Sequence, residues 1–155
     1  MRILALDPGG TTGYAIAEIP LPGLVELAYS QRKMDESELW DFLDAVQPNH
    51  IVCEDFEYRN KPPTGLDLTP IKLIGVVNLF ATNRNVRPEL YMQKAAVGKG
   101  HFTDLRLKTL NVYQKGVPHG RDAARHLLHW FTFGPGFKLV KEPKLELVNE
   151  KDLLK

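Results

Sequence analysis

The sequence predicts an α/β domain with a mixed five-stranded sheet and helices on both faces. The first three predicted strands follow one another through short turns, which is typical of an antiparallel meander. The later strands alternate with helical segments, which is typical of parallel pairing. With 155 residues, of which 43% are hydrophobic, the chain has the size of one domain and enough apolar side chains for one core.

The predicted meander occupies the first thirty residues. Residues 2–7 form a strand rich in Ile, Leu and Ala, and the glycines that follow predict a tight connection. Residues 14–18 return as the second strand. A turn at 20–23 contains two prolines and a glycine, and residues 24–30 then form the third strand.

A helix and a fourth strand follow the meander. Asp35 or Ser37 can cap a helix that runs to about Val46, because either side chain can accept a hydrogen bond from the first turn. Residues 50–56 are apolar up to an acidic end, which is the pattern of a strand buried on both faces.

The second half of the chain adds helices and one more strand. The whole of residues 1–137 is predicted to form one domain. The charged tail that follows, residues 138–155, is expected to be partly ordered at most. The predicted elements of this half are a loop at 59–65, a helix at 66–83, a strand at 86–92, a loop at 93–100, and helices at 102–114 and 119–131.

Two predicted strands end in carboxylates. Asp7 closes the first strand, and Glu54 lies at the end of the fourth. A buried carboxylate is costly unless it is paired or binds a metal, so these acids predict a functional site at the carboxyl ends of the strands. Asp7 could instead accept hydrogen bonds within its own glycine-rich turn.

The last predicted helix supplies two more candidates. His119 and Asp122 are three residues apart and therefore share one helix face. With Asp7 and Glu54 they form a set of hard oxygen donors and one nitrogen, which suits Mg²⁺ or Mn²⁺. Each also has a plainer explanation, since His119 can belong to the N-terminal cap and Asp122 can favour the helix dipole. The same helix contains two histidines that are interpreted as packing or surface residues, His126 and His129.

Charge is distributed unevenly, although the net charge is only +1. Residues 1–60 contain 4 Lys/Arg and 11 Asp/Glu, whereas residues 84–125 contain 9 Lys/Arg and 3 Asp/Glu. A basic segment that leads to His119 and Asp122 favours a phosphate-backbone ligand, although solvated helix faces would explain the same pattern.

The composition also limits the cellular setting. There is no run of 18 apolar residues to span a membrane, and the N-terminal apolar run is too short for a secretory signal, so no membrane partner is expected. The single cysteine, Cys53, excludes an internal disulfide and is consistent with a reducing cytoplasm.

Four motifs resemble those of the RuvC-type Holliday-junction resolvases, which have the RNase H-like fold. Asp7-Pro8-Gly9 with Gly13-Tyr14 is similar to their first motif, and Cys53-Glu54 is similar to their second acidic strand. Val97-Gly98-Lys99-Gly100 resembles their Val-Gly-x-Gly loop, and His119-Gly120-Arg121-Asp122-Ala123 resembles their closing motif. The motifs occur in the family order, and the short chain resembles a compact, phage-like member.

This resemblance implies a metal-dependent endodeoxyribonuclease that nicks Holliday junctions or other branched DNA as a homodimer, in the cytoplasm of a bacterium or of a phage-infected host. Two Mg²⁺ ions, for which Mn²⁺ can substitute, would act about 3.5–4 Å apart. Asp7 would bridge both ions, and Glu54 and Asp122 would each bind one. His119 would complete the ligand set or orient the attacking water.

The resemblance also implies where partners bind. The helix at 66–83 would form the dimer contact through exposed Leu68, Ile71 or Val76. The family often has lysines before and after its Val-Gly-x-Gly loop, but Gln93 and Asp104 stand at the matching positions here. The DNA-binding candidates are basic residues near the site and one aromatic residue that could stack on a base: Tyr58, Arg59, Lys94, Lys99, Arg106 and Lys108.

Two other functions fit the same motifs. An RNase H-like RNA-processing nuclease would share the Asp-Pro-Gly opening and the short chain. A non-catalytic junction-binding module would use the scaffold without cleaving DNA, although the intact acidic residues argue against it.

Overall fold

The computed structural model describes residues 1–57, 65, 67–83, 85 and 87–155. Within these residues it contains one six-stranded sheet. The strands, in chain order, are β1 (Arg2–Asp7), β2 (Thr12–Glu18), β3 (Leu24–Arg32), β4 (His50–Glu54), β5 (Glu89–Gln93) and β6 (Lys144–Leu147).

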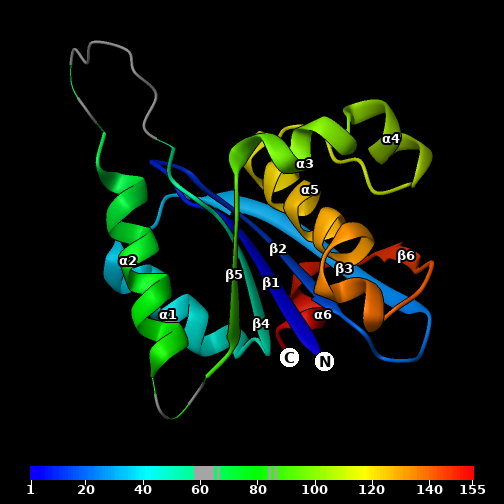
Figure 1. Cartoon of the computed structure of the whole chain (residues 1–155), viewed down its shortest axis with the longest axis horizontal. Coiled ribbons are helices and arrows are strands. Elements are labelled where there is room, and N and C mark those ends of the chain that lie inside the picture. Colours follow the sequence, from blue (N-terminus) through cyan, green and yellow to red (C-terminus); the bar gives the residue numbers. More distant parts are fainter. Residues whose placement is uncertain (58–64, 66, 84, 86) are drawn as a thin grey trace.

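The sheet is mixed, as predicted, and its spatial order is β5-β4-β1-β2-β3-β6. The strands β1, β2 and β3 form the antiparallel meander. On one side of the meander, β4 pairs in parallel with β1, and β5 pairs in parallel with β4. The carboxyl ends of β1, β4 and β5 therefore lie at the same edge of the sheet (Figure 1).

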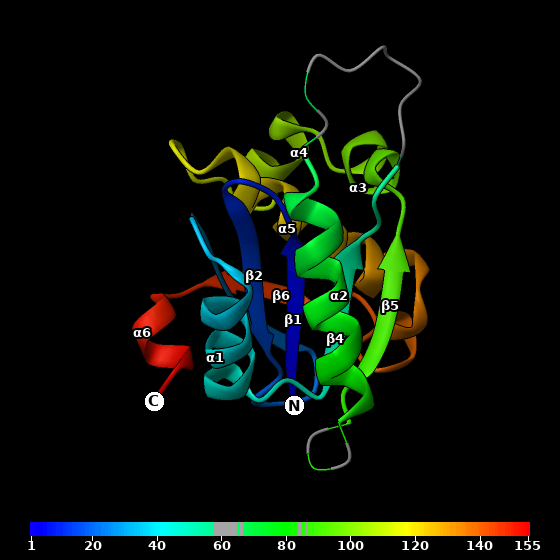
Figure 2. The same cartoon turned by 90° about the vertical axis from the view of Figure 1, so that its left-hand side faces the viewer.

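Helices cover both faces of the sheet, which confirms the predicted α/β class (Figures 1 and 2). One face carries α1 and α2, and α5 packs on the opposite face, with α3 and α4 beside it. The helices are α1 (Glu36–Val46), α2 (Thr69–Thr82), α3 (Ala95–His101), α4 (Asp104–Thr109), α5 (Pro118–Phe133), the 3-10 helix η1 (Pro135–Lys138) and α6 (Glu150–Leu153).

Two apolar cores lie on the two faces of the sheet. Because side chains alternate along a strand, Ile3 and Ala5 of β1 pack in the core beneath α5, whereas Leu4 and Leu6 pack in the core beneath α1 and α2. All four side chains are fully buried. The central strand is thus held from both sides, and its terminal residue Asp7 is carried by a rigid element.

The tail differs most from the prediction. The sequence analysis expected five strands and at most partial order beyond residue 138, but residues 144–147 form β6, and a short helix, α6, follows. The new strand pairs in parallel with β3, with Val25 opposite Leu145. The sparse apolar residues of the tail cover an otherwise open sheet edge, and Leu153 is buried in the core beneath α1 and α2.

Two predicted boundaries also change. The segment 93–100, predicted as a loop, ends β5 and forms most of α3. The helix predicted at 102–114 is the shorter α4, which Thr103 caps by accepting a hydrogen bond from the backbone N–H of Arg106. Helix α1 begins as predicted, and Asp35 is the residue that caps it, in a reciprocal pair with Glu38.

None of the helices in the described ranges is both long and apolar enough to cross a bilayer.

Candidate active site

Asp7 and Glu54 lie at neighbouring strand ends. The parallel register of β1 and β4 places Leu6 opposite Cys53, so the next residue of each strand is one of the two acids. Asp7 does not close its own turn. Thr12 does so instead, because its hydroxyl donates to the carbonyl of Gly9 at 3.2 Å. The structure thus favours the functional explanation of Asp7 over the turn explanation.

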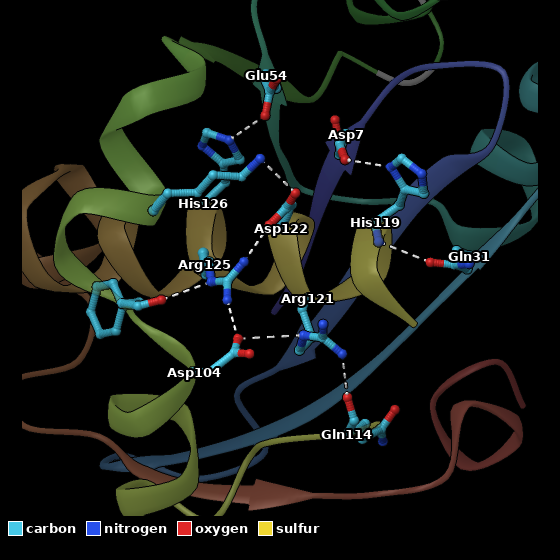
Figure 3. A network of polar contacts seen from close by, with 12 residues as sticks. Asp7, Gln31, Glu54, Asp104, Gln114, His119, Arg121, Asp122, Arg125 and His126 are labelled. Atoms are coloured by element: carbon cyan, nitrogen blue, oxygen red, sulfur yellow. Dashed lines mark hydrogen bonds and ion pairs between the residues drawn. The ribbon is translucent and has the colours of Figure 1, made fainter. Parts of the chain in front are cut away.

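Helix α5 brings three polar residues to the same place. His119, Asp122 and His126 are spaced three and four residues apart and therefore form one stripe along the helix. Figure 3 shows this stripe facing Asp7 and Glu54. The sequence analysis placed only His119 and Asp122 in the site.

Two glycines allow α5 to approach the meander closely. A Cβ atom on Gly13 of β2 would lie 1.9 Å from the backbone oxygen of His119, and one on Gly120 would lie 2.6 Å from the backbone oxygen of Ser30. Only a residue without a side chain fits either position. The backbone N–H of His119 also donates to the side-chain oxygen of Gln31 at 2.8 Å, which fixes the start of the helix against β3.

The carboxyl group of Asp7 is electrostatically coupled to the rest of the site. Its pKa is raised from 3.8 to about 6, first by burial and then by the negative charges of Glu54 and Asp122, while the hydrogen bond with His119 lowers it. The Nδ1 atom of His119 lies 3.2 Å from Oδ2 of Asp7 (Figure 3). The side chain of Asp7 is only 13% exposed, so water screens its charge poorly.

Glu54 is held by a residue that the sequence analysis did not place in the site. Its Oε2 atom lies 2.8 Å from Nε2 of His126, and the other ring nitrogen of His126 lies 2.8 Å from the side-chain oxygen of Gln93. His126 is 1% exposed, so it is a buried residue. The interpretation of His126 as a packing or surface residue did not include its contacts with Glu54 and Gln93. Its spacing of four residues from Asp122 was the available signal, because it places both side chains on one face.

Asp122 contacts two cations. Its Oδ2 atom lies 2.8 Å from Nζ of Lys99, and Oδ1 accepts from the guanidinium of Arg125. Arg125 also pairs with Asp104 and donates through Nε to the carbonyl of Phe102 at 2.7 Å (Figure 3). Arg125 therefore ties Asp122 to the loop between α3 and α4.

The three carboxylates surround a common space. The pKa of Lys99 is raised first by its hydrogen bond to Asp122, and also by the negative charges of Asp122, Glu54 and Asp7. The ammonium group of Lys99 is therefore near all three acids. The carboxylates of Glu54 and Asp122 are in turn near enough to Asp7 to raise its pKa, in addition to the larger effect of burial. The side chains converge from β1, β4 and α5 in Figure 3.

This donor set suits a hard divalent cation in its chemistry. Three carboxylates and one imidazole are ligands that Mg²⁺ and Mn²⁺ accept, and after burial the negative charge of Glu54 is the main cause that raises the pKa of Asp7. Across the described part of the chain, however, no three His, Cys, Asp or Glu side chains already stand in a metal-ligating arrangement. Asp122 instead contacts Lys99 and Arg125, Glu54 contacts His126, and Asp7 contacts His119.

The predicted DNA-binding residues fall in three groups. Tyr58 and Arg59 lie outside the described residues. Lys99 lies in the site, on α3, and Lys94 is the exposed residue that precedes this helix. The remaining two, Arg106 and Lys108, lie on α4. The guanidinium of Arg106 lies 4.8 Å from the ring centre of Phe102, and the ammonium of Lys108 lies 4.8 Å from that of Tyr113.

The sheet order, the flanking helices and the placement of the acids define a mixed α/β fold with a cluster of carboxylates at one edge of the sheet. The fold that the motif resemblance implied is confirmed by solved structures. Thermus thermophilus RuvC superposes with a TM-score of 0.59 at 17% identity, over 86% of this chain and 97% of that one. No family model matches the sequence, and no curated protein sequence matches it either.

Two further structures support the same fold. The T. thermophilus RuvC in complex with Holliday junction substrate superposes with a TM-score of 0.60 at 14% identity, over 86% of this chain and 97% of that one. The fowlpox virus Holliday junction resolvase superposes with a TM-score of 0.54 at 19% identity, over 84% of this chain and 97% of that one. At such identities the likeness shows the fold, and the activity has to be argued from the site.

Proposed function

We propose that the chain is a metal-dependent endonuclease that cuts four-way DNA junctions or other branched DNA. The observation that carries this proposal is the convergence of Asp7, Glu54 and Asp122 from two neighbouring strand ends and one helix, on a fold shared with known resolvases. A cluster of carboxylates at the carboxyl ends of central strands is where an α/β sheet presents its ligands.

The proposed metal ligands are Asp7, Glu54, Asp122 and His119. When bound, a pair of Mg²⁺ or Mn²⁺ ions would activate water and stabilise the leaving oxygen of the phosphodiester. Asp7 contacts His119, and its pKa is raised by the charges of Glu54 and Asp122 after the larger effect of burial, so it lies near all three other proposed ligands. His119 can either join the ligands or hold a water molecule for attack, since its ring faces Asp7.

The DNA backbone would reach the site across α3. Lys99 is 56% exposed while it contacts Asp122, so its ammonium group can turn toward a phosphate at little cost. Lys94, at the start of the same helix, and the basic residues of α4 extend positive charge away from the acids. These contacts would not read base sequence, because they involve the phosphate backbone.

Cleavage of paired strands calls for two copies of the site, and we propose that α2 forms the dimer contact. Leu68, Ile71 and Leu79 of this segment are 46%, 44% and 63% exposed. Val76, which the sequence analysis also considered, packs against the core instead. The exposed positions recur at helical spacing and include Gly75, where a Cβ atom would meet nothing within 4 Å.

A nicking assay tests the proposal directly. Purified wild-type protein should nick a mobile four-way junction with Mg²⁺ or Mn²⁺, and Asp7→Asn should lose this activity while still binding the junction in EDTA. Unchanged cutting by Asp7→Asn would eliminate the proposed site.

The two alternatives give different results in the same assay. Preferential cutting of an RNA–DNA hybrid over the junction would identify an RNase H-like RNA-processing nuclease. Tight junction binding without cleavage under any divalent metal would identify a non-catalytic binding module.

A further inference from the structure

The ring of His126 connects two strand ends through the last core helix. It lies on α5, one turn beyond Asp122, and is almost completely buried. Its Nε2 atom contacts Glu54 at the end of β4, and its Nδ1 atom contacts Gln93 at the end of β5, both at 2.8 Å. Both ring nitrogens are therefore occupied, so His126 is not available as a metal ligand.

The contact with Glu54 has a definite direction. An ionised carboxylate only accepts hydrogen bonds, so the Nε2–H of His126 donates to Oε2 of Glu54. The amide of Gln93 can meet Nδ1 with its oxygen or, after a half-turn, with its NH₂ group. Gln93 can therefore satisfy the second nitrogen in either protonation state, and the donor side of the ring stays directed at Glu54.

The second carboxylate oxygen of Glu54, Oε1, has no hydrogen-bond partner among the described residues. The Glu54 side chain is 19% exposed, so one side of it remains accessible. Asp122 is also held from α5, because Arg125 donates to its Oδ1 atom, although its Oδ2 atom contacts Lys99. In both residues an α5 side chain thus holds one of the two carboxylate oxygens.

We propose that His126 and Gln93 are positioning residues that hold the Glu54 carboxylate in the orientation in which it would bind a divalent metal ion. This inference rests on the proposed metal-dependent function and adds residues that the motif resemblance does not include. Hydrogen-bonded partners behind a ligand orient it, and their loss weakens metal binding by roughly 10–100-fold. The position of Gln93, where the resemblance places a lysine, is explained by this inward contact.

Mn²⁺ binding to the full-length, DNA-free protein tests the inference without relying on activity. The free-Mn²⁺ signal in electron paramagnetic resonance should give a dissociation constant for each variant. His126→Leu, which removes the donor, should bind Mn²⁺ roughly tenfold more weakly. His126→Gln should remain within about threefold of the wild type, because its amide NH₂ can replace the Nε2–H donor.

His129→Leu is the matched control. His129 lies on the same helix but packs with His101 and Phe133, so its loss should leave Mn²⁺ binding unchanged. A merely structural role of His126 would lower the free energy of unfolding in EDTA without changing the Mn²⁺ dissociation constant of the folded protein. Equal Mn²⁺ affinity of folded His126→Leu and wild type would overturn the inference.

A second variant covers the case in which His126→Leu does not fold. Gln93→Leu removes the contact behind the ring from a half-buried position and should weaken Mn²⁺ binding by roughly tenfold. Wild-type affinity in Gln93→Leu would then overturn the inference. A wild-type protein that neither binds Mn²⁺ nor nicks junctions would instead overturn the proposed function itself.

Discussion

The ammonium group of Lys99 lies 2.8 Å from Oδ2 of Asp122, the carboxylate oxygen that Arg125 does not hold. The same ammonium senses Asp7 and Glu54. Lys99 is therefore a protein cation at the carboxylate cluster, where the proposed function requires a divalent ion. A bound metal ion and the ammonium group of Lys99 would compete for the carboxylate of Asp122. Lys99 could instead pair with a phosphate of the DNA.

Lys99→Met should have opposite effects on the two ligands. Without the competing ammonium group, the DNA-free protein should bind Mn²⁺ roughly three- to tenfold more tightly. Junction binding in EDTA should weaken, because one phosphate contact is lost. Calorimetry with Mn²⁺ and a gel-shift assay with a labelled junction measure the two effects.

Lys108→Met is the control for loss of one positive charge. Lys108 contacts the ring of Tyr113 on α4, so this variant should bind Mn²⁺ like the wild type. If Lys99→Met and Lys108→Met showed the same Mn²⁺ affinity, the competition between Lys99 and the metal would be refuted.

Asp7→Asn should stabilise the metal-free protein even though it removes the central acid. The pKa of Asp7 is raised to about 6, mainly by burial, so ionisation of this group opposes folding at neutral pH. A shift of this size corresponds to a gain of about 1–3 kcal/mol in the free energy of unfolding. Urea unfolding in EDTA at pH 7.5 measures it.

The pH dependence of this gain has a defined sign. Between the unfolded pKa of 3.8 and the folded pKa of about 6, the folded protein binds more protons at Asp7 than the unfolded chain does. The wild type therefore loses stability as pH rises through this window, and the advantage of Asp7→Asn should shrink as pH falls toward 4. A pH-independent difference would show that the ionisation of Asp7 is not its cause.

Gly13→Ala should disturb the contact that carries His119. A methyl group at residue 13 would overlap the backbone of α5, at 1.9 Å from the His119 oxygen, and the helix would have to move. We expect a loss of about 1–3 kcal/mol in the free energy of unfolding and reduced nicking. Gly10→Ala, in the turn that precedes β2, is the control, because its Cβ would meet nothing within 4 Å. Equal stability of the two variants would contradict the close approach of α5 to β2.

Ile71→Asp should separate the proposed dimer. A charge in the exposed stripe of α2 would be buried at the subunit contact, where an unpaired carboxylate is costly. Light scattering at micromolar concentration should report a dimer for the wild type and a monomer for the variant, with little change in monomer stability. Leu105→Asp, at a still more exposed apolar position on α4, should leave the dimer intact. A wild-type monomer would refute the dimer proposal.

Much of the fold could be predicted because its signals are local. The apolar runs before Asp7 and Glu54 predicted two buried strands, and the structure pairs them in parallel. The tail could not be predicted in this way. Its few apolar residues are too sparse to indicate a strand alone, and β6 forms because the edge of β3 provides hydrogen-bond partners.

The sequence by itself determined the class of fold and identified the candidate acids. A carboxylate at the end of an apolar strand is a candidate because burying its charge costs free energy wherever the strand packs. The tertiary structure alone decided which side chains hold those acids. His126 meets Glu54 across 72 positions, and Arg125 joins Asp122 to Asp104. Such contacts depend on how closely α5 lies on the sheet, and that distance is set by packing between elements far apart in the chain.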